Sequence, residues 1–274
     1  MKTPKISVIM GIYNCEATLE EAMESLFAQT YQDFEIILCD DGSTDGTRKV
    51  AEKYVQQYPD RVRLLVNEHN LGLNKTLNKC LKAARGEYFA RMDGDDISLP
   101  SRFEEQVEFL DNHPEFAIVG TPMIFFDDSG DWGTNSRLEY PTVHDFYRHS
   151  PFFCHATVMV RREAYVAVEG YSEDSRTLRF EDCHLWYKMY AKGYRGYNIQ
   201  HPLYKMRDDK NAFKRKTLRS RMNACYVQYC GYKMLGVPSY QYARMIKTFF
   251  VGLILGLIPE SLYIWLHKKK MNLK

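Results

Sequence analysis

Apolar residues follow two alternating spacings along the first part of the chain. Short apolar runs of strand length occupy residues 6–10, 34–39, 62–66 and 88–92. Each of the first three runs is followed by apolar side chains at intervals of three and four residues, the pattern of an amphipathic helix. Strands that alternate with helices of this length predict a mostly parallel sheet with helices on both faces, and therefore an α/β fold.

The pattern becomes weaker after residue 96, but it still predicts regular structure. The elements expected there are helices over residues 101–110 and 182–191, a strand over residues 117–126, and a turn or loop over residues 127–138. We therefore expect this second part to extend the first part rather than to repeat it.

Four polar segments directly follow the four predicted strands. They read GIYN at residues 11–14, DDGSTDGT at residues 40–47, NEHNLGLN at residues 67–74 and DGDD at residues 93–96. Ligands of open α/β sheets bind at the carboxyl ends of the strands. We therefore expect these four segments to meet at one edge of the sheet and to form the ligand site.

The DGDD segment places three carboxylates, those of Asp93, Asp95 and Asp96, at the end of an apolar strand. Two carboxylates about 5 Å apart repel each other by about 3 kcal/mol at an effective dielectric constant near 20. A divalent cation offsets this repulsion, and Mg²⁺ and Mn²⁺ prefer oxygen ligands. The alternative is a tight Asp/Gly turn that only connects the strand to the next element.

The DDGSTDGT segment also contains more acidic residues than a turn requires. Ser43, Thr44 and Asp45 suit the beginning of a helix, where they satisfy backbone amides and interact favourably with the helix dipole. That explanation does not cover Asp40 and Asp41, which prolong the strand. One of these carboxylates can accept a hydrogen bond from the ring N–H of a pyrimidine base, and we favour Asp41 over Asp40 for this role.

A further acidic pair lies in RFEDCHLW, residues 179–186, which also reads as the beginning of a helix. Glu181 and Asp182 lie at its N-terminus, where a carboxylate is tolerated and can take a proton from an alcohol. The single histidine of this segment, His184, is better explained as a structural residue of the helix than as a metal ligand.

Taken together, these segments resemble the family 2 glycosyltransferases, enzymes with the GT-A fold. The similarity extends over about residues 5–192 and includes GIYN, DDGSTDGT, ARMDGDD and FEDCHLWYKM in the expected order. It implies a Rossmann-like, mostly parallel sheet with flanking helices, a nucleoside-diphosphate sugar donor with UDP-sugar as the expected form, and inversion at the anomeric carbon. The enzyme class that it implies is a hexosyl- or N-acetylhexosaminyltransferase.

The resemblance also implies roles for individual residues. It gives uracil recognition to Asp41 and packing near the base to Tyr13. It gives contacts to metal and ribose to Asp95 and Asp93. The substrate-binding residues expected in total are Tyr13, Asn14, Asp40, Asp41, Asn70, Asn74, Arg91 and Asp93, and the metal expected at Asp95 and Asp93 is Mn²⁺ or Mg²⁺.

The general base implied by the resemblance is Asp182, which takes the proton of the acceptor hydroxyl with Glu181 in support. One departure concerns Leu77, which stands where many relatives have the arginine of an Ala-Arg-Asn sequence. Lys75 or Arg91 is the candidate for the missing cationic contact to the donor. The Gln-x-x-Arg-Trp sequence of processive synthases does not occur in the chain, which favours the addition of one sugar at a time.

Charge divides the chain more sharply than its totals of 37 basic and 35 acidic residues suggest. Residues 205–274 contain 15 Lys or Arg and 3 Asp or Glu, whereas residues 1–204 carry a net charge of −10. The acidic part repels a nucleic-acid backbone, so nucleic acid is not an expected partner. The basic part includes the apolar residues 248–258, which are too few to span a bilayer but suit its anionic interface. The alternative is a C-terminal helix packed on the catalytic domain or on a partner.

These expectations divide the chain into three parts. Residues 1–96 form the nucleotide-sugar-binding half, residues 97–204 the half with the acceptor site and the catalytic base, and residues 205–274 a basic, membrane-associating helical tail. We expect a cytoplasmic protein on the inner face of the cell membrane, acting on a glycan or lipid-linked acceptor in cell-envelope or extracellular polysaccharide synthesis. The rival interpretation is a catalytically silent protein that binds a nucleotide or a partner at the membrane.

Overall fold

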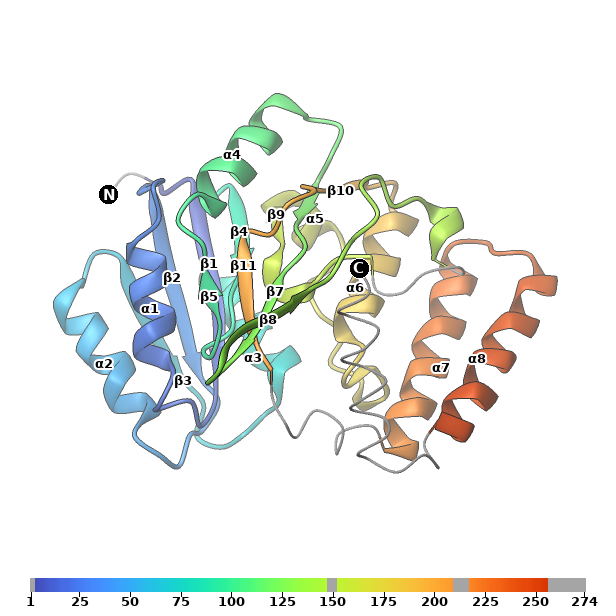
Figure 1. Cartoon of the computed structure of the whole chain (residues 1–274), viewed down its shortest axis with the longest axis horizontal. Coiled ribbons are helices and arrows are strands. Elements are labelled where there is room, and N and C mark those ends of the chain that lie inside the picture. The colour runs from blue at the N-terminus through green and yellow to red at the C-terminus, as the bar shows by residue number, and fades with distance from the viewer. Residues whose placement is uncertain (1–2, 147–151, 209–216, 256–274) are drawn as a thin grey trace.

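A seven-stranded sheet forms the centre of the computed structural model, which describes residues 3–146, 152–208 and 217–255 (Figure 1). The spatial order of its strands is β10-β6-β9-β4-β1-β2-β3. Neighbouring strands are parallel except where β9 pairs with β4 and β6, which confirms the mostly parallel sheet. The strands are β1 (Ile6–Ile12), β2 (Phe34–Asp40), β3 (Val62–Val66), β4 (Tyr88–Arg91), β6 (Ile118–Gly120), β9 (Met159–Arg161) and β10 (Gly196–Asn198).

The predicted alternation of strands and helices is confirmed in the first half of the chain. The helices between the strands are α1 (Leu19–Phe27), α2 (Thr47–Gln57) and α3 (Leu73–Ala83). Strand β1 pairs in parallel with β2 and β4, and the order β3-β2-β1-β4 is that of a Rossmann-like sheet. The polar segments that follow these strands therefore begin at the same edge of the sheet.

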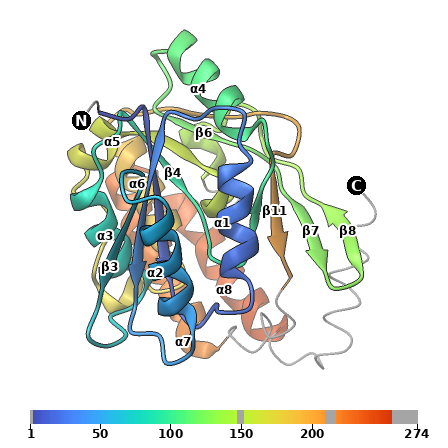
Figure 2. The same ribbon diagram turned by 90° about the vertical axis from the view of Figure 1, so that its left-hand side faces the viewer.

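Helices cover both faces of the sheet because its strands send buried side chains into two apolar cores. Val8 and Met10 of β1 belong to one core, which also contains residues of α1, α2 and α4 (Arg102–Asn112). Ile9 belongs to the other core, which contains residues of α3, α5 (Arg162–Ala167) and α6 (Glu181–Ala191). Figure 2 shows α1 and α2 on one side of the strands and α3 and α5 on the other.

The sequence pattern does not predict the second sheet, which has four strands. In spatial order they are β5 (Ile97–Ser98), β11 (Tyr204–Arg207), β7 (Ile124–Asp127) and β8 (Gly130–Thr134). The single strand predicted over residues 117–126 is wrong, because β6 lies in the first sheet and β7 in the second. Pro122 lies between these two strands, and a proline cannot donate to a strand ladder.

The turn or loop predicted over residues 127–138 is only partly correct, because residues 130–134 form β8, which pairs with β7 as an antiparallel hairpin. The sequence of β8, GDWGT, has two glycines and one large apolar residue, so the period of a strand is hidden. Trp132 supplies the apolar contact of this strand by stacking on Phe125, with 5.1 Å between the ring centroids.

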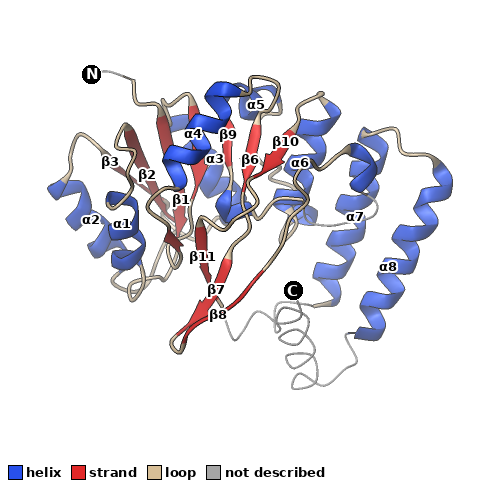
Figure 3. Cartoon of the chain, turned by 45° about the horizontal axis from the view of Figure 1, so that its top comes forward, coloured by secondary structure: helices blue, strands red, loops and turns tan. Residues whose placement is uncertain are grey.

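Two helices follow β11 in the C-terminal part of the described chain. They are α7 (Leu218–Met234) and α8 (Tyr242–Leu255), which lie side by side beyond α6 (Figure 3). Val227 and Tyr232 of α7 belong to the same apolar core as Leu185 of α6. Helix α7 therefore packs on the body of the protein, which is the alternative arrangement considered for the tail.

The boundary predicted at residue 205 falls within a strand. Lys205 and Arg207, the first basic residues of the predicted tail, belong to β11 and so to the second sheet. Among the helices that the structure describes, none is both long and apolar enough to cross a membrane. Residues 209–216 and 256–274, with many of the basic residues of the tail, lie outside the described residues.

Candidate active site

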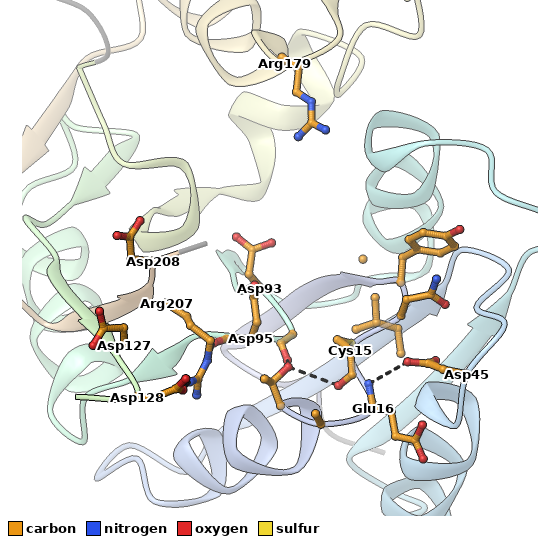
Figure 4. A pocket seen from close by; sticks show the side chains of 17 residues that line it. Cys15, Glu16, Asp45, Asp93, Asp95, Asp127, Asp128, Arg179, Arg207 and Asp208 are labelled. Carbon is orange, nitrogen blue, oxygen red and sulfur yellow. Dashed lines mark hydrogen bonds and ion pairs between the residues drawn. The ribbon is translucent and has the colours of Figure 1, made fainter. Parts of the chain in front are cut away.

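The polar segments predicted to meet at the edge of the sheet do so around two adjoining cavities. The larger cavity has a volume of about 870 Å³ and is lined by residues of GIYN, DDGSTDGT and DGDD, together with residues of β7, β11 and the turn before α6 (Figure 4). The smaller cavity, of about 330 Å³, is lined by residues of GIYN, by Asp41 and by the beginning of α3. Tyr13 and Arg179 line both cavities, so the two share a wall.

The DGDD turn divides its three carboxylates between the cavity and the protein interior. Asp93 and Asp95 line the larger cavity, as expected for a ligand site (Figure 4). Asp96 is 3% exposed and accepts hydrogen bonds from the Tyr204 hydroxyl and the Arg207 amide, both at 2.9 Å. The third carboxylate therefore holds β11 to this turn and does not line the larger cavity.

Arg91 lies beneath the cavity rather than in its wall. Its side chain is 1% exposed, and its Nη2 lies 2.6 Å from Oδ1 of Asp93. Burial alone would lower the pKa of Arg91, but the neighbouring Asp93 carboxylate raises it, so the guanidinium stays charged. The position predicted for a direct contact to the donor thus serves to hold Asp93 in place.

The paired carboxylates of Asp93 and Asp95 fit a divalent cation whose coordination shell is completed by a bound ligand. Desolvation within the cavity and, secondarily, the charge of Asp93 raise the pKa of Asp95 to about 6. A cation would relieve this repulsion, and Mg²⁺ and Mn²⁺ are commonly held by one or two carboxylates with phosphate oxygens and water. Among the described residues, no group of three or more His, Cys, Asp or Glu is arranged to hold a metal without such a ligand.

Asp41 is fixed in the wall of the smaller cavity by donors from the loop after β3. Its carboxylate accepts hydrogen bonds from the backbone amides of Leu71 and Gly72, at 2.8 and 2.9 Å, and from the Asn67 side chain at 2.8 Å. Gly42 allows the two loops to touch, because a Cβ there would lie 2.7 Å from the backbone of the neighbouring loop. Its φ of +72° is also one that a residue with a Cβ rarely adopts.

Asp40, the other carboxylate considered for base recognition, is 1% exposed and does not line either cavity. Its Oδ1 accepts a hydrogen bond from the Ser43 amide at 3.1 Å. The structure thus places Asp41, and not Asp40, where a nucleoside could reach it.

The remaining residues predicted to bind substrate have different surroundings. Tyr13 is 48% exposed in the shared wall, and Asn70 lines the smaller cavity. Asn14 lines the larger cavity, but its Oδ1 accepts the Thr44 amide at 2.9 Å and so ties the first two loops together. Asn74 is buried and donates to Ser172 O and Thr177 Oγ1, which positions the segment before α6.

The acidic pair predicted to act as base begins α6. Glu181 lines the smaller cavity, and its pKa is raised to about 7 by burial and by the charge of Asp182. Burial also raises the pKa of Asp182, whose carboxylate accepts the Cys183 amide at 2.7 Å and does not line either cavity. His184 is buried in the helix, and burial lowers its pKa to about 4, in accord with a structural role.

Sequence reasoning missed the residues that close the larger cavity on the side away from the first sheet. Two of them, Asp127 and Asp128, had a signal in the sequence, because after an apolar run they repeat the acidic pair of DDGSTDGT. Arg207 and Asp208 had none, because only the second sheet brings β11 to this place. The missed residues are Asp127, Asp128, Arg179, Arg207 and Asp208.

A Rossmann-like sheet with paired carboxylates at the end of its fourth strand matches the arrangement expected for a glycosyltransferase of the GT-A fold. The chain belongs to glycosyl transferase family 2, whose model matches residues 7–168. It is 43% identical over 272 residues to "Putative glycosyltransferase EpsE" of Bacillus subtilis (strain 168), covering 99% of this chain and 96% of that protein. It is 34% identical over 205 residues to "Amylovoran biosynthesis glycosyltransferase AmsE" of Erwinia amylovora, covering 73% of this chain and 75% of that protein.

Solved structures show the same fold. S. aureus TarS 1-349 in complex with UDP-GlcNAc matches with a TM-score of 0.66 and 20% identity, covering 96% of this chain and 79% of that one. The mannosyltransferase PcManGT from Pyrobaculum calidifontis, in complex with GDP-Man and Mn²⁺, matches with a TM-score of 0.65 and 19% identity, covering 97% of this chain and 80% of that one. The GT-A fold expected from the sequence is confirmed.

Proposed function

We propose that this chain is an inverting glycosyltransferase that moves one hexosyl or N-acetylhexosaminyl unit from a UDP-sugar to a hydroxyl group of a glycan or lipid-linked acceptor. The observation that carries the proposal is the pair of adjoining cavities, one with Asp41 and Tyr13 in its wall and the other with Asp93 and Asp95. A nucleoside diphosphate has two corresponding parts. Its base suits the cavity with Tyr13 and Asp41, and its diphosphate suits a cation held by Asp93 and Asp95. The UDP-GlcNAc bound to TarS supports the choice of donor.

The nucleoside would lie in the smaller cavity. Tyr13, which is exposed in the shared wall, would pack on the base, and Asp41 would accept its ring N–H. Asp93, held by Arg91, would contact the ribose from the larger cavity. Mn²⁺ or Mg²⁺ held by Asp95 and Asp93 would offset the negative charge that develops on the diphosphate, and the Mn²⁺ of the PcManGT complex supports this choice.

The chain's own residues would perform the proton transfer. Asp182, with Glu181 beside it, would take the proton of the acceptor hydroxyl as that oxygen forms a bond to the anomeric carbon. The bond from the anomeric carbon to the diphosphate would break on the opposite face, and its electron pair would leave with the diphosphate. One such displacement inverts the configuration of the donor sugar.

The biological setting proposed here is the synthesis of cell-envelope or extracellular polysaccharide. The name of the Erwinia amylovora relative places that protein in amylovoran biosynthesis, which supports a glycan acceptor. We place the protein in the cytoplasm, on the inner face of the cell membrane, where both a nucleotide sugar and a lipid-linked acceptor are accessible.

A panel of UDP-, GDP- and TDP-sugars, each incubated with the full chain and Mn²⁺, tests the function. We expect hydrolysis or transfer to be fastest with one UDP-sugar and to stop when EDTA removes the metal. Nucleotide binding without turnover of any donor, with polyprenyl-phosphate-linked glycans present as acceptors, would instead support the catalytically silent alternative.

We further propose that α7 and α8 bind the surface of an anionic membrane. Each helix exposes an apolar pair one turn apart: Leu218 and Met222, both 59% exposed, on α7, and Ile246 and Phe250, 52% and 58% exposed, on α8. Exposed basic residues accompany both pairs, Arg219 on α7 and Lys247 on α8. Apolar side chains flanked by lysine and arginine suit the boundary between lipid headgroups and acyl chains.

Replacing Ile246 and Phe250 together by serine should weaken binding to vesicles of phosphatidylglycerol and phosphatidylcholine by about tenfold or more. Each change removes an apolar side chain whose burial contributes about 1 kcal/mol or more. Flotation of the protein with the vesicles measures the effect, and Val166→Ser, at a 66% exposed valine of α5, serves as control. Equal flotation of wild type and the double variant would contradict the membrane surface proposed here.

A further inference from the structure

The turn that enters α6 holds an arginine in a backbone conformation that arginine rarely adopts. Arg179 has a φ of +73°, in the left-handed region, where a residue with a Cβ costs about 1 kcal/mol or more. Its side chain is exposed and lines both cavities. Figure 4 shows the guanidinium directed into the larger cavity from the side opposite Asp93.

Contacts from two other helices hold this turn in place. Asn223 of α7 donates to Leu178 O at 3.2 Å, and Asn74 of α3 donates to Thr177 Oγ1 at 3.2 Å. Within the turn, the Phe180 amide donates to Thr177 O at 2.9 Å. The strained conformation of Arg179 is therefore imposed by its surroundings, as at many ligand-binding turns.

The larger cavity is mostly acidic, and Arg179 is one of the few positively charged residues in its wall. Seven acidic residues and two arginines, Arg179 and Arg207, line this cavity in the described part of the chain. The Arg207 guanidinium is already engaged, because it donates to Asp95 O and forms an ion pair with Glu21. The backbone of Arg179 donates a hydrogen bond to the Glu181 carboxylate, and the charge of Arg179 also acts on that carboxylate. Its guanidinium, however, forms no direct hydrogen bond or ion pair with another side chain of the described residues.

We propose that Arg179 binds the diphosphate of the sugar donor and stabilises the charge on it as the sugar leaves. The inference rests on the proposed function. A diphosphate that joins a nucleoside in the smaller cavity to a sugar in the larger one passes the shared wall, which Arg179 lines. A guanidinium fits phosphate oxygens with two parallel hydrogen bonds, which a lysine cannot reproduce. Arg179 thus supplies the cationic contact that Leu77 leaves open.

Calorimetric titration of UDP and of uridine in metal-free buffer tests the inference without relying on activity. Arg179→Gly removes the charge and also relieves the positive φ, so the variant should melt at or above the temperature of the wild type. We expect it to bind UDP about ten- to a hundredfold more weakly, the loss typical of a hydrogen bond to a charged group, and to bind uridine as the wild type does. Arg179→Lys should fall between the two.

The matched control is Arg176→Ala, since Arg176 lies in the same segment but pairs with Asp174 and lines neither cavity. Unchanged UDP affinity in Arg179→Gly would overturn the inference. So would an equal loss of uridine and UDP, because the residue would then shape the nucleoside cavity alone. Failure of the wild type to bind any of UDP, GDP and TDP, even with Mn²⁺ added, would overturn the proposed function itself.

Discussion

Replacing Asp182 by asparagine is expected to lower the rate of sugar transfer by about a thousandfold, within the range for loss of a general base. Asparagine has nearly the same size but cannot accept the proton of the acceptor hydroxyl. The donor should bind with unchanged affinity, because Asp182 does not line the cavities in which the donor would lie. Single-turnover transfer and calorimetric titration of UDP measure the two effects separately.

Glu181→Gln is the informative comparison for Asp182→Asn. Glu181 lines the smaller cavity and has a pKa of about 7, so it is only partly ionised at neutral pH. We expect this variant to keep activity within about tenfold of the wild type, because a supporting residue contributes less than the base. If Glu181→Gln lost transfer and Asp182→Asn kept it, the role of base would belong to Glu181. If Asp182→Asn lost donor binding and transfer equally, Asp182 would not be a base.

Asp95→Ala is expected to remove the effect of Mn²⁺ on nucleotide binding and to abolish transfer. Asp95 supplies one of the two carboxylates proposed to hold the cation, and loss of a group that merely supports a metal ligand already lowers metal affinity by about 10- to 100-fold. We therefore expect a loss of at least about 100-fold in Mn²⁺ affinity in the presence of UDP. Titration of Mn²⁺ into the UDP complex, followed by the paramagnetic broadening of the nucleotide resonances, measures it.

Asp128→Ala controls for the general loss of negative charge from the same cavity. Asp128 lines that cavity, and its carboxylate is 91% exposed and lies 3.9 Å from Arg207. This variant should bind Mn²⁺ within a few-fold of the wild type, because an exposed ion pair of this length contributes little. If Asp95→Ala kept the wild-type response to Mn²⁺ and to Mg²⁺, the proposed cation site would have to be abandoned.

The first half of the fold could be predicted because each element there carries its own pattern. The strands before residue 96 are short apolar runs, and the helices between them have clear apolar stripes. The rule that ligands bind at the carboxyl ends of parallel strands then brought Tyr13, Asp41, Asp93 and Asp95 to one edge. The two cavities lie at that edge.

The second sheet could not be predicted in the same way. Its strands are short, and β8 has two glycines where a strand pattern needs apolar residues. The sheet is joined to the site by contacts between distant positions, such as the hydrogen bond from Tyr204 to Asp96, 108 residues apart. The spacing of apolar residues within one segment carries no information about such a contact. The residues that β11 brings to the cavity were therefore missed.

The sequence by itself determined the α/β class, the strand–helix alternation and the acidic edge of the sheet. These depend on which side of each segment is apolar, and that is a property of a few neighbouring residues. Only the tertiary structure decided that Arg91 lies under Asp93, that Asp96 faces inward, and that Arg179 and Arg207 reach the cavity. Those outcomes depend on how segments far apart in the chain pack, and burial and charge pairing act only after they meet.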